Sequence, residues 1–196
     1  MKKLVIASNN PGKLREFQAM LAPLGIEVLT QSQLGILDAE EPHCTFIENA
    51  LAKARHVSKY SGFPALADDS GICVSALGGA PGVYSARYAG DDPKSDMRNN
   101  EKLLQSMQGV VDRRAHYYCV LVLVTHAEDP QPVLAEGEWH GEIAHEERGV
   151  GGFGYDPLFW LPQQGKMSSE LTHEEKSMLS HRGQAMGILL QKLKIK

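Results

Sequence analysis

The chain has 196 residues, of which 42% are hydrophobic and 22% charged, so we expect residues 1–196 to form a single globular domain. Its 20 lysines and arginines are outnumbered by 24 aspartates and glutamates. The resulting net charge of −4 argues against nonspecific nucleic-acid binding, which relies on a basic surface.

The sequence shows no segment suited to a membrane or to secretion. Its longest apolar run, residues 117–124, is too short to cross a bilayer. The apolar segment after the two N-terminal lysines is too short for a signal peptide. Cys44, Cys73 and Cys119 lie far apart and form no C-x-x-C pair, which is typical of reduced thiols. We therefore expect a cytoplasmic protein with no membrane or nucleic-acid partner.

The first predicted elements are an apolar strand over residues 1–7 and a helix that follows it directly. Asn10 is a favourable N-cap, and Pro11 suits the first helical position because its missing N–H would be unpaired there. Apolar residues then recur at helical spacing from Leu14 onward. This turn offers free backbone N–H groups and the ammonium of Lys13, and it predicts an anion-binding site.

A second helix is predicted from residue 46 to about residue 60. Thr45 and Glu48 have the spacing of a capping box at its start. One side of this helix is apolar, and Asn49 and Lys53 lie on the polar stripe opposite. Taken separately, Lys13 and Lys53 are most typical of solvated surface lysines.

The segment "FPALADDSGICVSAL", residues 63–77, predicts a strand, an acidic turn and a second strand. Asp68 and Asp69 then stand at the end of an apolar strand, where α/β proteins place their chemistry. Adjacent strand residues point to opposite faces, so we expect one carboxylate to enter a cleft and the other to support it. The alternative is an ordinary Asx turn without chemistry.

Two more carboxylates, Glu40 and Glu41, precede the helix that carries Lys53. Carboxylate oxygens suit Mg²⁺, which keeps several waters and is often bound through substrate phosphates. Lysines beside these carboxylates, near helix starts, fit a triphosphate–magnesium complex.

The remaining elements mix strands with helices and predict an α/β fold. Strands are predicted over residues 26–30 and 115–126, with a partner in "PVLAEGEWHGEIA", and helices over residues 94–107 and after "SHRG". Thr172 and Glu175 form a second capping-box pattern.

A glycine-rich loop, residues 149–154, matches G-x-G-x-x-G, but a strand rather than a helix follows it, which excludes a dinucleotide fingerprint. Phe153 and Tyr155 in this loop suit base stacking, although aromatic residues in such places often belong to a core. No Walker A, serine-hydrolase or zinc pattern occurs in the sequence.

Six segments, taken together, resemble the inosine/xanthosine triphosphate pyrophosphatase family. They are "SNNPGK", "EEPHCTFIENALAKAR", "ALADDSG", "LGGAPGVYSARYAG", "GGFGYDPLF" and "EEKSMLSHRGQA", in order from about residue 4 to about residue 190. The resemblance implies hydrolysis of the noncanonical purine nucleoside triphosphates ITP, dITP and XTP to the monophosphate and pyrophosphate. It also implies Mg²⁺ dependence, a homodimer, and an elongated mixed β-sheet with flanking helices, whose two lobes surround a nucleotide-binding cleft.

The resemblance, together with the polar helix stripe, nominates site residues. Asp69 and Asp68 are the expected catalytic residues, and Asp69, Glu40 and Glu41 the expected metal ligands. The expected substrate-binding residues are Ser8, Asn9, Asn10, Pro11, Gly12, Lys13, Asn49, Lys53, Ser70, Phe153, Gly154, Tyr155, Asp156, Lys176, His181 and Arg182. The sequence departs from the family at Pro42-His43, where Thr-Gly is usual, so the choice between Glu40 and Glu41 stays open.

The residues fit direct attack by a water that a magnesium ion acidifies and a carboxylate deprotonates, because no side-chain nucleophile with an activating partner is visible. Three alternatives stay open at this point. They are a nucleotide-binding regulator without turnover, a pyrophosphatase for modified pyrimidine nucleotides, and a phosphotransferase.

Overall fold

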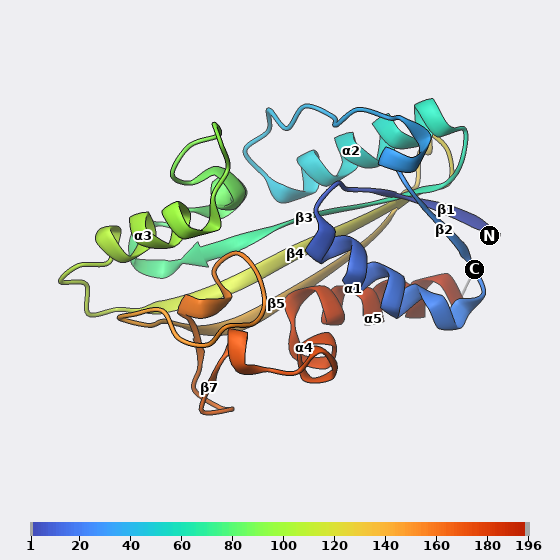
Figure 1. The fold of residues 1–196 in the computed structure, drawn as a ribbon. Helices are drawn as coiled ribbons and strands as arrows, with labels where there is room; N and C mark the ends of the chain where they lie inside the picture. The colour runs from blue at the N-terminus through green and yellow to red at the C-terminus, as the bar shows by residue number, and fades with distance from the viewer. Residues whose placement is uncertain (1, 195–196) are drawn as a thin grey trace. The chain divides into compact units, whose positions relative to one another are not determined.

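The computed structural model describes residues 2–194, which form a seven-stranded mixed sheet with flanking helices (Figure 1). The strand order is β2-β1-β3-β4-β5-β6-β7. The strands are β1 (Lys3–Ala7), β2 (Glu27–Thr30), β3 (Ala65–Val74), β4 (Arg114–Val124), β5 (Val133–Ile143), β6 (Phe159–Leu161) and β7 (Lys166–Met167). The α-helices are α1 (Pro11–Leu21), α2 (Phe46–Ser61), α3 (Asp96–Ser106), α4 (His173–Leu179) and α5 (His181–Lys194).

The sheet combines two kinds of pairing. Strand β1 pairs in parallel with both β2 and β3, whereas β6 pairs antiparallel with β5 and β7. The parallel pairs are joined through helices, as parallel connections require, and the antiparallel ones through shorter loops. The predicted α/β class with a mixed sheet is confirmed.

The chain divides into two compact units, each assembled from separate segments. The first unit takes in the chain up to Asp69, residues 119–137, and the chain from Gln184 onward. The second unit contains residues 70–118 and 138–183. Strands β3, β4 and β5 each contribute residues to both units.

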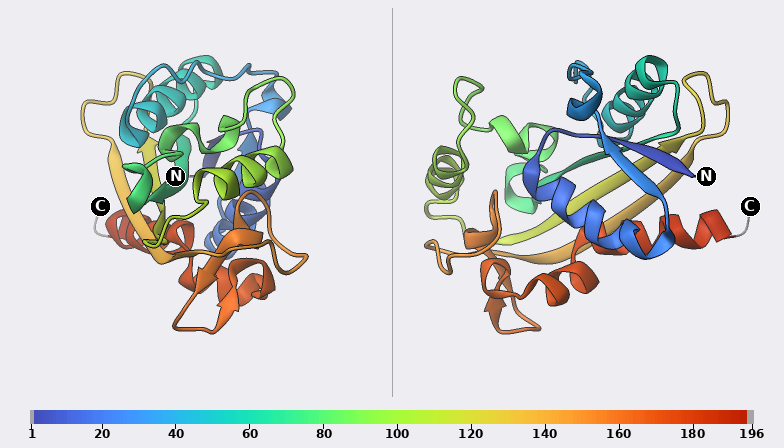
Figure 2. Two further views of the ribbon diagram at one scale, coloured as in Figure 1. Left: turned by 90° about the vertical axis from the view of Figure 1, so that its left-hand side faces the viewer. Right: turned by 45° about the vertical axis from the view of Figure 1, so that its right-hand side comes forward.

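In the first unit, helix α2 covers one face of the strands, and α1 and α5 cover the other (Figures 1 and 2). The core on the α1 and α5 side is apolar because both helices turn a hydrophobic stripe inward. Its buried members include Leu4, Leu66, Phe17, Leu121 and Met186.

In the second unit, a separate core gathers around the aromatic residues of β4, β5 and β6. Tyr117, Trp139 and Phe159 pack together there with Ile72 of β3 and Leu103 of α3. Tyr117 and Phe159 meet edge to face, with their ring centroids 4.7 Å apart. This core supports the loop that connects β5 to β6.

The predicted helix starts are confirmed. The Asn10 side chain accepts hydrogen bonds from the N–H groups of Gly12 and Lys13, and Pro11 is the first residue of α1. Thr45 caps α2, and at α4 Thr172 and Glu175 form the reciprocal capping box.

Two predictions about secondary structure are wrong. No acidic turn interrupts residues 65–74, because β3 runs unbroken through Asp68 and Asp69. The strand continues because each carboxylate finds a partner on a neighbouring element, as described below. The last helix begins at His181, within "SHRG" rather than after it, since the Ser180 hydroxyl accepts from the N–H of Gly183 and caps the helix there. No helix within residues 2–194 is long and apolar enough to span a membrane.

Candidate active site

The turn between β1 and α1 is shaped by its own polar side chains. The Ser8 hydroxyl accepts from the N–H of Asn10 at 3.2 Å, and the Asn9 amide donates to Asp38 at 2.8 Å. Because Asn10 already binds the N–H groups of Gly12 and Lys13, these two donors are not free, contrary to the sequence prediction. Anion binding at this turn stays a prediction, and the Lys13 ammonium is the cationic group that the turn offers for it.

Lys13 forms an ion pair with Asp68. The Lys13 ammonium on α1 contacts Asp68 Oδ1, and the Asp68 side chain is completely buried. The other oxygen, Oδ2, accepts a hydrogen bond from the Cys119 thiol of β4 at 3.2 Å. Both oxygens of this carboxylate thus have a donor.

Lys53 joins two carboxylates on α2's side of the strands. Its ammonium donates to Asp69 Oδ1 at 2.8 Å and to Glu41 Oε1 at 2.9 Å. Burial acts to lower the pKa of Lys53, but the charges of Asp69 and Glu41 outweigh it and raise that pKa above 10.5. Lys53 is therefore a stable cation at neutral pH.

Asp69 keeps one oxygen without a partner. Its Oδ2 is buried and accepts no hydrogen bond within the described residues. Burial raises the pKa of Asp69 above its ordinary 3.8, although the ammonium groups of Lys53 and Lys13 oppose the shift. A buried carboxylate oxygen without a donor is costly, and a bound water or cation would satisfy it.

The expected opposite orientation of the two adjacent aspartates is confirmed, and the entry of one of them into a cleft stays a prediction. Asp68 faces Lys13 of α1, and Asp69 faces Lys53 of α2, as the alternation of side chains along a strand requires. The partners of Asp69 fit a catalytic carboxylate, and those of Asp68 a supporting one.

The acidic loop contributes Glu41. Lys53 pairs with Glu41, whereas Glu40 forms no ion pair in the described part of the chain. The Asn49 amide is buried and bonds both to the N–H and to the carbonyl of His43, each at 3.1 Å. Asn49 thus holds the loop that carries Glu41, and its predicted contact with substrate stays a prediction.

The carboxylates of Asp69 and Glu41 are the residues that fit a metal ion. Across residues 2–194 no cluster of three or more histidine, cysteine, aspartate or glutamate side chains could hold a metal alone. Mg²⁺ needs no such cage, because it commonly uses one or two carboxylates with waters and substrate phosphates. The unpaired Oδ2 of Asp69 suits that role.

In the second unit, Asp156 holds the glycine-rich loop in place. Its carboxylate accepts from the Phe153 N–H at 2.8 Å and from the Ser168 hydroxyl at 2.7 Å, and it forms an ion pair with Lys176. Gly152 makes this possible: it has a φ of +79°, and a Cβ there would lie 2.1 Å from Asp156 Oδ2. The buried Asp156 carboxylate therefore has a structural task in the loop.

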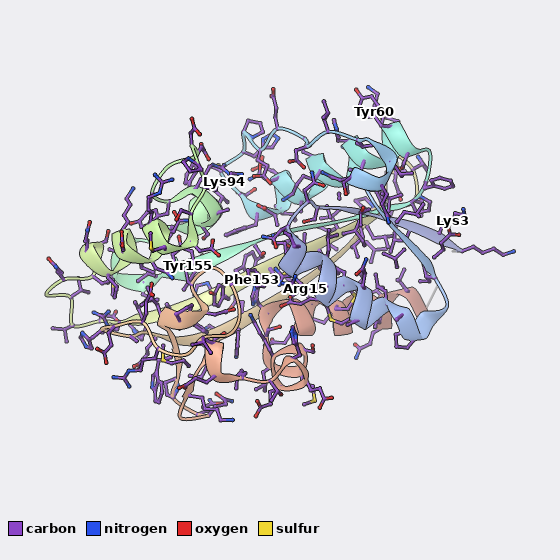
Figure 3. The ribbon with its side chains drawn as sticks, viewed as in Figure 1. Lys3, Arg15, Tyr60, Lys94, Phe153 and Tyr155 are labelled. Atoms are coloured by element: carbon purple, nitrogen blue, oxygen red, sulfur yellow. The ribbon has the colours of Figure 1, made fainter. Side chains whose placement is uncertain are left out.

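Figure 3 labels Phe153 in this loop and Tyr155 directly after it, and these two aromatic residues differ in their burial and contacts. Phe153 is half-buried, with the Lys176 ammonium 4.8 Å from its ring centroid. Tyr155 is buried in the core, and its hydroxyl donates to the carbonyl of Ser85 at 2.7 Å. The prediction of a stacking role suits Phe153, whereas the Tyr155 side chain has a place in the core instead.

Helix α3 fixes the next loop residue. The Gly154 N–H donates to Asp96 at 2.7 Å, and the Gly154 carbonyl accepts from the Asn100 amide at 3.2 Å. Asp96 and Asn100 lie more than fifty positions from Gly154 in sequence, and Ser168 lies 12 positions from Asp156, so no local pattern points to these three residues. In the first unit, Cys119 lies 51 positions from Asp68 and Asp38 lies 29 from Asn9.

Helix α5 begins with two buried residues, His181 and Arg182. Arg182 is only 2% exposed, and its guanidinium donates to the Ser70 hydroxyl at 3.0 Å. The His181 ring stacks on Tyr117, with centroids 4.7 Å apart and planes within 8° of parallel. The structure thus brings Ser70 and Arg182 into contact, and it packs the His181 ring against Tyr117.

Comparison with known proteins decides the family. The profile of the Ham1 family matches residues 4–192. The chain belongs to the Ham1 family. A dITP/XTP pyrophosphatase of Nitrosomonas europaea is 64% identical to it over 98% of this chain and 95% of its own length. One of Ralstonia nicotianae is 61% identical over 100% and 98% of the two chains.

Solved Ham1-family structures agree with the fold. A HAM1 protein from Coxiella burnetii is 44% identical, with a TM-score of 0.93 and full coverage of both chains. A nucleoside-triphosphatase, dITP/XTP pyrophosphatase, from Mycobacterium abscessus is 38% identical, with a TM-score of 0.75 over 96% of this chain and 98% of its own. The family resemblance that the sequence segments indicated is confirmed.

Proposed function

We propose that this Ham1-family chain hydrolyses the noncanonical purine nucleoside triphosphates dITP, XTP and ITP to the monophosphate and pyrophosphate. The observation that carries the proposal is the buried carboxylate of Asp69, which keeps an unpaired oxygen beside the Lys53 ammonium. Relatives named dITP/XTP pyrophosphatase, which match at least 98% of this chain, support the choice of substrate.

The first unit supplies the groups for phosphate chemistry. Asp69 and Glu41 would hold Mg²⁺, which when bound neutralises phosphate charge and lowers the pKa of a coordinated water. The Asp69 carboxylate accepts the proton of the attacking water. Lys13 and Lys53 stabilise the charge that develops on the phosphoryl oxygens. Asp68 acts through Lys13 rather than on the reacting atoms.

The second unit supplies the groups for base recognition. Phe153 offers an aromatic ring for stacking, which favours any purine. Arg182 and His181 would donate to the 6-oxo group that hypoxanthine and xanthine carry and adenine lacks. A guanidinium is a permanent donor without acceptor capacity, so an amino group at that position is left unpaired and is rejected. Lys176 and Ser70 complete the proposed contacts with the base and sugar.

The wider setting follows from the same family. We propose that residues 1–196 act as one pyrophosphatase domain, since the family profile spans segments of both units. Cys44, Cys73 and Cys119 form no disulfide within the described residues, which suits the reducing cytoplasm. A homodimer is the proposed assembly, as the family resemblance implies.

Product analysis tests the proposal directly. The purified chain is incubated with dITP and Mg²⁺, and the products are followed by phosphorus NMR. We expect deoxyinosine monophosphate and pyrophosphate as the primary products. Orthophosphate with the diphosphate would refute the proposed reaction, and full activity in excess chelator would refute the metal requirement.

A further inference from the structure

The Cys119 thiol contacts a carboxylate on which the proposed phosphate site depends. Cys119 lies in β4 with no exposed surface, and its Sγ donates to Asp68 Oδ2 at 3.2 Å. The other oxygen of Asp68 accepts from the Lys13 ammonium of α1. Side chains from three different elements are therefore linked by hydrogen bonds, from Cys119 through Asp68 to Lys13.

Burial makes the geometry of this carboxylate depend on its donors. A charged carboxylate without access to water is tolerated only when it is paired and hydrogen-bonded. The last torsion of an aspartate side chain is broad, so one ion pair alone does not fix the plane of the carboxylate. A donor on Oδ2 fixes that plane and with it the direction in which Oδ1 holds Lys13.

Packing alone does not explain a thiol at this position. Cys119 belongs to the buried cluster that includes Leu66, Leu121 and Met186, and the other buried members of this cluster are all apolar. Among the buried members of that cluster, Cys119 alone carries a side-chain hydrogen-bond donor. The donor points at Asp68, next in the chain to the proposed catalytic Asp69.

We propose that Cys119 is a positioning residue for phosphate binding. Its thiol orients Asp68, and Asp68 holds the Lys13 ammonium where the phosphates of the substrate bind. The inference rests on the proposed function, because that function assigns Lys13 to phosphate. Cys119 itself touches no substrate.

Substitutions of Cys119 separate the effect of its hydrogen-bond donor from the effect of its side-chain volume. Cys119→Ser keeps a donor, whereas Cys119→Ala and Cys119→Val remove it and bracket cysteine in size. We expect the serine variant to keep its affinity for inorganic tripolyphosphate and its kcat/KM for dITP within about twofold. The alanine and valine variants should lose about threefold to tenfold in affinity and in kcat/KM. This loss is smaller than the full value of a hydrogen bond to a charged group. Calorimetry gives the affinity without requiring turnover.

A double-mutant cycle with Lys13→Ala decides whether the thiol acts through the lysine. We expect Cys119→Ala and Cys119→Val to have no further effect in that background, because the group they misplace is already absent. Equal losses in both backgrounds, or a serine variant as impaired as the other two, would overturn the inference. If the alanine variant does not fold, as urea unfolding would show, the valine variant completes the cycle.

The same measurements keep this inference apart from the proposed function. A wild-type chain that releases no pyrophosphate from dITP refutes the proposed function. An active wild-type chain whose cycle shows independent losses refutes only the positioning role of Cys119.

Discussion

Asp69 and Lys53 share a buried environment but respond to it in opposite ways. Two carboxylates raise the pKa of Lys53 and keep it charged despite its burial. Burial raises the pKa of Asp69, because its effect outweighs that of the two neighbouring ammonium groups. A carboxylate that is ready to accept a proton, next to fixed positive charge, is what hydrolysis of an anionic substrate by water requires.

The first prediction at this scale concerns Asp69→Asn. The change keeps the shape of the side chain but removes the proposed proton acceptor and the negative charge that would hold the proposed metal ion. We expect a loss in kcat on the order of a hundredfold or more with the fold intact. Steady-state kinetics with dITP, alongside circular dichroism, checks this. Near-normal turnover by the folded variant would transfer the role to Glu41.

The second prediction is the pH dependence that the raised pKa of Asp69 produces. The proposed mechanism requires the ionised carboxylate of Asp69, so kcat/KM should decline on the acid side with an apparent pKa above 3.8. Between pH 3.8 and the raised pKa, the folded state binds more protons than the unfolded state, so ionisation of Asp69 lowers stability as pH rises.

Urea unfolding checks this sign. Relative to wild type, the free energy of unfolding of Asp69→Asn should increase as pH rises from about 4 to 7, because only the wild type ionises there. A difference that stays constant over this range would show that burial does not raise the pKa of Asp69.

The third prediction concerns the choice of base. Arg182→Ala should remove most of the preference for ITP over ATP, because a buried donor that discriminates against an amino group is lost. Phe153→Ala should weaken both substrates alike, since stacking holds any purine. The ratio of kcat/KM values for the two substrates decides it. An Arg182 variant that keeps its selectivity would show that another group recognises the base.

At the scale of the elements, the loop between β5 and β6 is rich in glycine but is held in one conformation by hydrogen bonds. Its many glycines suggest mobility. Hydrogen bonds nevertheless hold the loop, since Asp156 accepts from the Phe153 N–H and helix α3 bonds to both backbone groups of Gly154. Gly152 allows this because it has no side chain, whereas a Cβ at this position would collide with the Asp156 carboxylate. Phe153 is thereby held in a defined position.

The prediction at this scale is that Gly152→Ala disrupts the loop. Its Cβ would meet Asp156, so the hydrogen bond to the Phe153 N–H breaks, and we expect a loss of about 2 kcal/mol or more in stability with a rise in KM for dITP. Gly165→Ala is the matched control, because Gly165 also has a positive φ, of 62°, but open space around it. The control should cost about 1 kcal/mol and leave KM unchanged. Equal effects of the two changes would mean that only backbone strain matters.

For the whole molecule, three long strands each carry residues of both compact units. Consecutive residues of β3, Asp69 and Ser70, belong to the first and the second unit, and to the proposed phosphate-binding and base-recognising sets, respectively.

The prediction at this scale is the assembly. The homodimer that the family resemblance implies would have a mass of 43 kDa, twice the 21.5 kDa of the chain. Light scattering with size-exclusion chromatography at micromolar concentration measures it. A mass of one chain across the concentration range would contradict the proposed dimer.

Local signals in the sequence determined the helix starts. Asn10, Thr45 and Thr172 each bond to a backbone N–H two or three residues away, so short spacing is enough to predict them. The apolar runs of β1 and β4 were equally local, and six short segments together indicated the family. The existence and order of the main elements, and most of the candidate residues, followed from such signals.

The tertiary structure alone decided which candidates meet. Asp69 finds Lys53 16 residues away, and Asp68 finds Cys119 and Lys13 at separations of 51 and 55. Partners at such separations depend on strand order and helix placement, which periodicity does not specify. For the same reason only the fold could pair Lys53 with Glu41 rather than Glu40, place Tyr155 in the core, and carry β3 straight through two aspartates whose charges are compensated by distant side chains.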